Sequence, residues 1–254
     1  MKKKYYPFIF LVVLLHGLVI YSFGQGISLG VKAGIAIPNL KAPSSDNPVN
    51  TGWTSRLGPY FGFVAGFDIS EKLSIQAELN YASQGGKKKG LQAVPGSAFA
   101  DMVPPGFPLP DYLYADFNAE AKLNYIELPV MLKLSLPIGE TASFFVNAGP
   151  YAGFLVSAKN VSNGASNVYA DKGLTQPLTT EPVSFDTTQD IKDDISKLNA
   201  GIQLGVGFAL NFGNGSLFLT GGGNYGLTNI QKDPANGKNH TGAATVTLGY
   251  LIRL

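Results

Sequence analysis

The sequence has 254 residues, of which 45% are hydrophobic and 14% charged, where an average protein has about 25% charged residues. It contains no cysteine, which excludes disulfides, thiolate nucleophiles and cysteine-ligated metals. Its formal net charge of +2 is due to Lys2, Lys3 and Lys4; the sequence after position 24 has 16 basic and 17 acidic residues, a net charge of −1, so nucleic-acid binding has no electrostatic support.

Residues 1–24 have the pattern of a secretory signal peptide. The three lysines precede an apolar stretch over residues 8–20, and the small residues Ser22 and Gly24 occupy positions −3 and −1 of a cleavage site. We therefore expect residues 1–24 to be removed on export. An uncleaved anchor is the alternative, because the stretch approaches the lower length limit for a membrane-spanning helix. No later apolar run reaches that limit, which excludes a helical membrane protein.

From residue 27 onward, apolar residues occupy alternate positions in eight separate segments. The segments cover residues 27–37, 57–69, 73–81, 125–136, 143–157, 198–212, 217–228 and 244–254. Such alternation gives a strand one apolar face and one small or polar face. A soluble strand averages about five or six residues, whereas a tilted strand needs roughly 9–11 to cross a bilayer. Several segments, such as 198–212, sustain the alternation for longer than that, so the lengths favour a membrane barrel.

The connections between these segments alternate strictly between short and long. The short ones are residues 70–72, 137–141 and 213–215, and the long ones are about 38–56, 85–121, 159–196 and 229–242. Outer-membrane barrels have short periplasmic turns and long extracellular loops, and an even number of strands brings both termini to the periplasmic side. The sequence therefore predicts that residues 25–254 form an all-β fold: an eight-stranded antiparallel up-and-down transmembrane β-barrel. Two of its loops, 85–121 and 159–196, look irregular.

The apolar faces of the predicted strands are expected to point outward into lipid. A soluble, lipocalin-like barrel is the structural alternative, and it would turn those faces inward. The opposite faces are rich in Gly, Ser, Thr and Asn and would leave the core of the membrane barrel to small and polar side chains. Leu204, Phe208 and Leu248 distinguish the two folds, because they point outward in the first and into a shared interior in the second.

Three segments resemble a known family. They are residues 123–133 (LNYIELPVMLK), 144–151 (FFVNAGPY) and 30–34 (GVKAG). Together they resemble the PorT-like outer-membrane β-barrel family of Gram-negative bacteria, over residues 25–254, and Tyr-Ile-Glu-Leu-Pro is the most specific element. The resemblance implies an integral outer-membrane protein. One member of that family serves in a protein-secretion and gliding apparatus, so an accessory of an envelope assembly is one role that the resemblance implies.

Six charged residues fall on the faces predicted to line the lumen. They are Lys32, Asp68, Glu78, Glu127, Lys133 and Arg253. An eight-stranded barrel is just wide enough for side chains to fill, so charges inside it must pair or hydrogen-bond. We expect a structural network that closes the lumen. The alternative is an ion or proton pathway, or a paired-carboxylate site of Glu78 and Glu127, although the spacing does not show that these two approach each other.

Nothing in the sequence favours catalysis or a bound metal. A Ser–His pair would have to use His240 with a serine from another loop, such as Ser162 or Ser184. The four aspartates between residues 186 and 194 lack the spacing of a calcium-binding loop. We expect no catalytic residue, cofactor or metal.

The predicted extracellular side offers two binding surfaces. Lys87, Lys88 and Lys89 follow the third strand at the predicted outer rim, where they would meet lipopolysaccharide phosphates; an ordinary solubilising loop base is the alternative. Loops 85–121, with five prolines between residues 95 and 110, and 159–196 are candidate partner surfaces. The sequence thus favours a non-enzymatic outer-membrane barrel that contacts lipid and, through loops or periplasmic turns, an envelope partner. The alternatives are a small-solute pore and, less favoured, a lipid-acting enzyme.

Overall fold

The structure is a computed structural model. It describes residues 26–42, 47–104, 106, 108–232 and 237–254. The predicted signal peptide, residues 1–24, lies outside the described residues. In the part that is described, no helix is long and apolar enough to cross a membrane.

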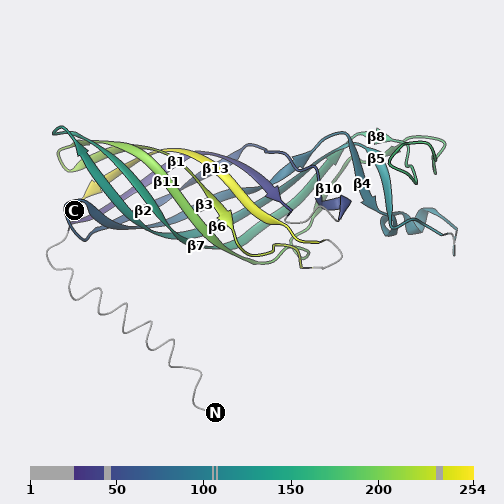
Figure 1. The fold of residues 1–254 in the computed structure, drawn as a ribbon, viewed down its shortest axis with the longest axis horizontal. Helices are drawn as coiled ribbons and strands as arrows, with labels where there is room; N and C mark the ends of the chain where they lie inside the picture. Colours follow the sequence, from purple (N-terminus) through teal and green to yellow (C-terminus); the bar gives the residue numbers. More distant parts are fainter. Residues whose placement is uncertain (1–25, 43–46, 105, 107, 233–236) are drawn as a thin grey trace, which may run out of the picture.

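Eight long antiparallel strands close into a ring (Figure 1). They are β1 (Ile27–Lys41), β2 (Gly58–Asp68), β3 (Leu73–Lys88), β6 (Asn118–Ile138), β7 (Ala142–Asn163), β11 (Leu198–Phe212), β12 (Gly215–Gly226) and β13 (His240–Arg253). Each strand of the ring pairs with the next one along the chain, and β13 pairs with β1. Closure gives the backbone groups of the wall partners within the sheet, which strands in lipid require. The predicted eight-stranded up-and-down barrel is confirmed.

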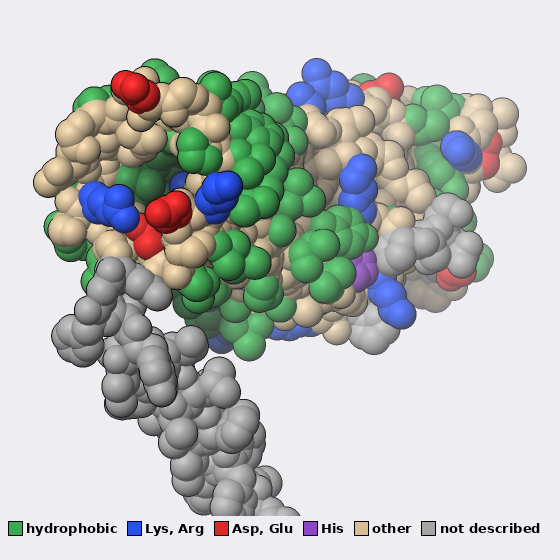
Figure 2. All heavy atoms as spheres, turned by 60° about the vertical axis from the view of Figure 1, so that its left-hand side comes forward, with side chains coloured by type: hydrophobic (Ala, Val, Ile, Leu, Met, Phe, Trp, Pro, Cys, Tyr) green, Lys and Arg blue, Asp and Glu red, His purple; other side chains and the backbone are tan. Residues whose placement is uncertain are grey.

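The outward face of the ring carries apolar side chains. Leu204, Phe208 and Leu248 are 57%, 57% and 54% exposed, so they point away from the interior, as a membrane barrel requires and a lipocalin-like barrel does not. Figure 2 shows hydrophobic side chains covering the barrel wall. Stacked aromatic pairs lie near both ends of this apolar belt, Phe61–Tyr81 at one and Phe212–Tyr250 at the other. Aromatic girdles of this kind sit at the two membrane–water interfaces.

The two ends of the barrel differ in the length of their connections. The short turns after β2, β6 and β11 lie at one end, at the positions predicted, and the C-terminus lies there too (Figure 1). Gly213 in the β11–β12 turn has a φ of +55°, which residues with a Cβ rarely adopt. We call this end periplasmic and the opposite end extracellular, following the loop lengths of outer-membrane barrels.

At the extracellular end the structure continues well beyond the belt. β6 and β7 have 21 and 22 residues, whereas β2 has 11. The further elements are η1 (Pro48–Asn50), β4 (Leu91–Pro95), η2 (Gly96–Met102), β5 (Tyr112–Asp116), β8 (Ala165–Ser166), β9 (Val183–Ser184) and β10 (Thr187–Asp190). β4 pairs with β5, β8 with β9, and β10 with the end of β7. The prediction that loops 85–121 and 159–196 are irregular is therefore wrong, because both contain paired strands. We call the part of β3, β6 and β7 above the belt, with these elements, the extracellular extension.

The apolar face of β6 changes sides where the strand leaves the belt. Within residues 126–138 the even-numbered apolar side chains face outward and most are exposed. Above this range Leu123 and Tyr125 are buried in the interior, while Lys122 and Asn124 lie on the outside. A surface surrounded by hydrocarbon favours apolar residues outside, and one surrounded by water favours them inside. The change of phase therefore marks the outer edge of the membrane-spanning wall.

Candidate functional site

The barrel interior is filled by polar and apolar side chains. The apolar group nearest the periplasmic end consists of Val64, Phe145, Ala209, Phe218 and Leu251. The one above the belt, where the extracellular extension meets the end of β1 and the neighbouring loops, consists of Leu40, Ala121, Leu123, Tyr125, Leu155, Ala158, Ile195 and Ile230. The polar groups lie between them. The sequence predicted a lumen of small and polar residues, and these aromatic and aliphatic fillers were not anticipated.

Glu78 on β3 is the centre of the lower polar group. Lys32 Nζ, from β1, lies 2.6 Å from Glu78 Oε2, and both side chains are buried. The same carboxylate accepts hydrogen bonds from Gln76 Nε2 at 2.6 Å and Asn80 Nδ2 at 2.8 Å. Lys32 Nζ also lies 4.8 Å from the centroid of the Tyr60 ring. A buried charge is tolerated when it is paired and hydrogen-bonded in this way.

Lys32 reaches Glu78 across an intervening strand. Gly62 on β2 is the register partner of both Lys32 and Asn80. A Cβ at Gly62 would lie 2.5 Å from Asn80 Oδ1, so a larger residue would collide with the polar group. The glycine leaves space over β2 for the Asn80 side chain, which hydrogen-bonds to Glu78.

Glu127 on β6 is the centre of the upper polar group. Its Oε1 accepts a hydrogen bond from Gln84 Nε2 at 3.0 Å, and its Oε2 accepts one from Asn224 Nδ2 at 3.0 Å. Gln84 Nε2 also donates to Asn224 Oδ1 at 3.2 Å. Among the described residues no cation forms an ion pair with Glu127, and its side chain has no exposed area. Two amides from β3 and β12 therefore hold this carboxylate.

A third polar group lies between β7, β11 and β13. Asn199 Nδ2 donates to Thr241 Oγ1 at 2.8 Å and to Tyr151 OH at 3.3 Å. Thr228 Oγ1 donates to Asn199 Oδ1 at 2.9 Å. These bonds tie the strands on this side of the barrel together at the extracellular edge of the belt.

The lumen is closed at the level of these groups. Five side chains from four strands have an exposed fraction of 0%: Asn80, Tyr125, Glu127, Leu155 and Thr241. A water-filled channel at this level would leave exposed area on the side chains that line it. The arrangement thus links strands through buried hydrogen bonds and fills the lumen, while Asn80 Oδ1, Gln84 Oε1 and Tyr125 OH have no hydrogen-bond partner among the described residues.

The remaining predicted lumen charges lie nearer the periplasmic end. Arg253 Nη2 lies 2.6 Å from Asp68 Oδ2 at the ends of β13 and β2, with side chains 65% and 35% exposed. Lys133 Nζ lies 4.2 Å from the centroid of the Phe145 ring. Figure 2 shows charged side chains around the open mouth at this end. The six charges therefore fall into separate groups: Glu78 pairs with Lys32, and no hydrogen bond between described residues joins Glu78 to Glu127.

The amides that surround the two carboxylates were not predicted from the sequence. Gln76, Gln84, Gln203 and Asn224 have no charge to single them out, yet each hydrogen-bonds within the polar groups. The available signal was their position on the inward phase of an alternating strand. Arg56 was missed because it lay in a predicted loop; its Nε is 2.7 Å from Glu120 Oε1, in the extracellular extension.

The residues weighed for catalysis do not come together. His240 Nδ1 lies 3.0 Å from the carbonyl oxygen of Gly226, and its ring stacks on Tyr225. Ser162 Oγ donates to the carbonyl oxygen of Phe185, and Ser184 Oγ accepts from the N–H of Asp186. In the described part of the chain, no three His, Cys, Asp or Glu side chains are grouped to hold a metal ion.

The three lysines predicted at the outer rim lie in different environments. β3 continues to its end at Lys88, so these residues stand above the belt rather than at its edge. Lys88 is 7% exposed, Lys87 is half-buried and Lys89 is exposed. Lys88 lies outside the membrane-spanning part of β3, and burial lowers its pKa from the ordinary lysine value to about 8.

Comparison with known proteins gives a family and a group of solved barrels. The family model described as outer membrane protein beta-barrel domain matches residues 22–232. The fold is similar to that of Ail, the attachment invasion locus protein of Yersinia pestis, with 12% identity, a TM-score of 0.38, and 90% of this chain and 99% of that chain covered.

Two further solved barrels are similar at comparable levels. Neisserial surface protein A matches with 12% identity and a TM-score of 0.37, covering 89% of this chain and 97% of that one. A major outer membrane protein of Thermus thermophilus matches with 14% identity and a TM-score of 0.46, covering 91% and 100%. No curated protein matches the sequence.

Proposed function

The chain belongs to the outer membrane protein beta-barrel domain family, and from this premise we propose that it is a non-enzymatic outer-membrane protein whose extracellular extension contacts an envelope partner. Export through a cleaved signal peptide, residues 1–24, is part of the proposal. The barrel wall serves as the membrane anchor, and the extension carries the contact surface.

One observation carries this proposal: the lumen is closed, while the extension is a folded body of paired strands. β6 and β7 each have about twice the roughly 9–11 residues that a strand needs to cross a bilayer. Their upper parts enclose an apolar core of their own that includes Leu123, Tyr125 and Leu155. Anchoring alone does not require such a body, whereas presenting a rigid surface to a partner does.

The most specific segment of the PorT-like resemblance lies at the boundary between the wall and the extension. Tyr-Ile-Glu-Leu-Pro spans the change of phase on β6 and contains Glu127, the centre of the upper polar group. These residues shape the wall and the lumen, because Tyr125 and Glu127 are buried inside and Leu128 faces outward. A role as an accessory of an envelope assembly therefore rests on the resemblance and on the size of the extension.

The two other functions considered have less support. A small-solute pore conflicts with the closed lumen around Glu127. A lipid-acting enzyme conflicts with the environment of His240 and with the engagement of Glu78 and Glu127 by structural partners. Single-channel recording in planar bilayers separates the pore from the proposed function: we expect no stable open level, and a clear one would overturn the proposal.

The contact surface is tested by site-specific photo-crosslinking in cells. A photoreactive residue is placed at Leu91 or Leu178, both exposed on the extension, and matched control positions are Leu204 in the belt and Glu71 in a periplasmic turn. We expect one envelope protein to be crosslinked from the extension positions alone. Crosslinking to that protein from Glu71 alone, or from no position, would contradict the proposal.

A further inference from the structure

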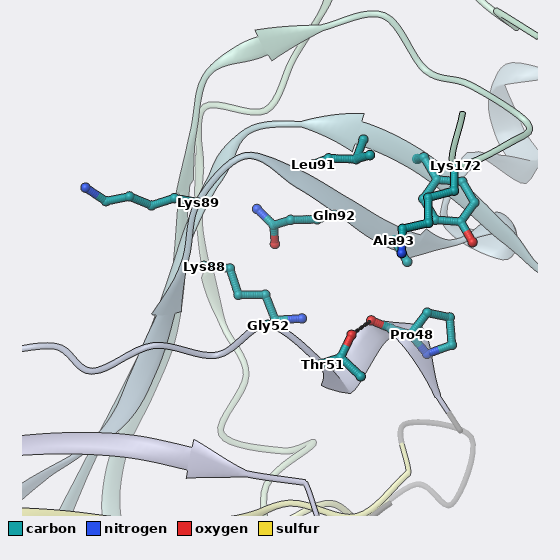
Figure 3. Close-up of a pocket in the computed structure, with 10 residues that line it drawn as sticks. Pro48, Thr51, Gly52, Lys88, Lys89, Leu91, Gln92, Ala93 and Lys172 are labelled. Atoms are coloured by element: carbon teal, nitrogen blue, oxygen red, sulfur yellow. Dashed lines mark hydrogen bonds between the residues drawn. The ribbon is translucent and has the colours of Figure 1, made fainter. Parts of the chain in front are cut away.

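A pocket of about 260 Å³ lies in the extracellular extension, between η1, the end of β3 and the β4–β5 hairpin (Figure 3). Its lining includes Lys88, Lys89 and Lys172, with Gln92 and Tyr114. None of the ten lining residues is acidic. A pocket that concentrates positive charge and has no carboxylate of its own is suited to an anion.

Lys88 is the most constrained of the three lysines. Its ammonium donates to the carbonyl oxygen of Val49 at 2.5 Å and lies 4.6 Å from the centroid of the Trp53 ring. Neither contact supplies a negative charge, and a lysine ammonium has three N–H donors. Burying an ammonium without a counter-ion is unfavourable. Among the described residues, Lys88, Lys89 and Lys172 form no ion pair, so no carboxylate compensates the buried Lys88 ammonium, while Lys89 and Lys172 are exposed to solvent.

The lysines are not equivalent in their orientation. Figure 3 shows Lys88 beside Gly52 and Thr51 on one side of the pocket and Lys172 beside Ala93 on another, with the Gln92 amide near Lys88 and directed away from Lys172. The Lys89 ammonium points away from the others in the same view. Lys88 and Lys172 come from segments far apart in the sequence, so their juxtaposition is a product of the fold.

We propose that this pocket binds an oxyanion of the phosphate-ester type, carried on a body no larger than a monosaccharide. Lys88 and Lys172 supply the positive charge, and Gln92, whose amide nitrogen donates to the carbonyl oxygen of Phe117, forms part of the pocket wall. The volume lies just below the roughly 300–1,000 Å³ of pockets that hold drug-sized ligands, which sets the upper limit on size. The inference rests on the proposed function and names the chemistry that the extension would recognise.

The height of the pocket bears on the source of the ligand. Tyr81 is the last belt residue on β3, and Lys88 is seven residues further along the strand. At about 3.3 Å per residue and a tilt near 40°, Lys88 stands roughly 18 Å above the apolar belt. The headgroup region of a bilayer adds only about 5–8 Å on each side. The phosphate ester therefore comes from the water, or from the saccharide part of a lipopolysaccharide that extends above the headgroups.

The site is tested by titration calorimetry on the purified full barrel in detergent micelles. The probes are a hexose monophosphate, inorganic phosphate and the uncharged hexose. We expect the hexose monophosphate to bind, inorganic phosphate to compete with it, and the uncharged hexose not to bind. Absence of binding of both phosphate probes at millimolar concentration would overturn the proposal.

Matched variants separate the pocket from general surface charge. Lys172→Gln removes an exposed pocket lysine, and Lys159→Gln removes an exposed lysine elsewhere on the extension with the same change in net charge. Loss of one charge-assisted hydrogen bond weakens binding by about tenfold or more, and we expect this for Lys172→Gln alone. Equal weakening in both variants would show non-specific attraction and would overturn the site.

A second variant tests the role of Lys88, and added lipopolysaccharide identifies the source of the ligand. Lys88→Met keeps the aliphatic stem beside Trp53, so the β-hairpin is expected to persist by circular dichroism while phosphate binding falls by at least the same factor. Unchanged binding in a folded Lys88→Met barrel would overturn the role of Lys88. If lipopolysaccharide added to the micelles competes with the hexose monophosphate, the ligand is its saccharide phosphate; if it does not, the ligand is soluble. Failure of crosslinking with intact phosphate binding would overturn the protein partner and leave this site standing.

Discussion

The membrane-spanning wall and the extracellular extension share strands, but the wall turns its apolar side chains outward and the extension turns them inward. In the wall, β6 turns Leu128, Val130 and Leu132 outward and encloses Glu127 and the polar groups. In the extension the same strand encloses apolar side chains and turns polar ones outward. The reversal follows from the surroundings: hydrocarbon surrounds the wall, and water surrounds the extension.

The two parts are therefore held together by different interactions. The wall gains stability from lipid-facing apolar side chains and from an ion pair and hydrogen bonds between buried polar side chains inside. The extension has an ordinary hydrophobic core, made of residues such as Leu123 and Leu155. A change that is harmless in one part is expected to be damaging in the other, and the following variants test that contrast.

The largest effect is expected from breaking the ion pair inside the wall. Lys32→Met leaves Glu78 buried without a cation, and we expect the free energy of unfolding to fall by about 3–5 kcal/mol. The double variant Lys32→Met/Glu78→Gln is expected to recover most of that loss. Both are measured by urea unfolding in lipid vesicles. A single variant as stable as the unmodified protein would show that the pair is not needed.

The apolar core of the extension is tested by Leu123→Ala. Removing a buried leucine side chain costs about 2–5 kcal/mol, and here the loss is expected to be confined to the extension. Hydrogen exchange at β6 and β7 above the belt measures it, with exchange in the wall as the internal reference. Lys122→Ala, at the neighbouring outward position, is the control and is expected to change little.

The lipid-facing surface of the wall is tested by Leu132→Arg. A cationic residue facing lipid costs about 2–4 kcal/mol near the bilayer midplane. Asn124→Arg puts the same side chain on the same face of β6, above the change of phase, and is expected to be nearly neutral. If both variants lost equal stability in vesicle unfolding, the position of the belt edge would be wrong.

The smallest effect is expected at the periplasmic mouth. Asp68→Asn removes the ion pair with Arg253, but both side chains are more than one-third exposed, so water and salt screen the interaction. We expect a change in unfolding free energy below about 1 kcal/mol. A loss as large as that of Lys32→Met would mean that the mouth is closed to water in the membrane.

The wall could be predicted from the sequence because its signal is a repeated period of two. The eight segments and three short turns occur where the alternation and the turn residues indicated. The upper part of β6 could not be found in the same way, although residues 119–125 also alternate. Their apolar positions are odd-numbered, while those from Ile126 onward are even-numbered, so a search for one continuous phase stops at Tyr125.

The contacts inside the lumen could not be predicted from the sequence, for a different reason. Lys32 meets Glu78 across β2, and that contact depends on strand register rather than on spacing along the chain. The pocket could not be predicted for the same reason. Lys172 lies in a loop far from Lys88 in the sequence, and Lys88 was grouped with Lys87 and Lys89 although the fold separates their side chains.

The change of phase at Ile126 also fixes the immersion depth of the protein. Sinking by four residues would bring Asn124 and Lys122 into hydrocarbon, and rising by four would expose Ile126 and Leu128 to water. The barrel therefore resists displacement along the membrane normal, and the extracellular extension stands at a constant height above the membrane. A ligand of the lysine pocket must therefore bind at that fixed height, whatever the thickness of the saccharide layer around the protein.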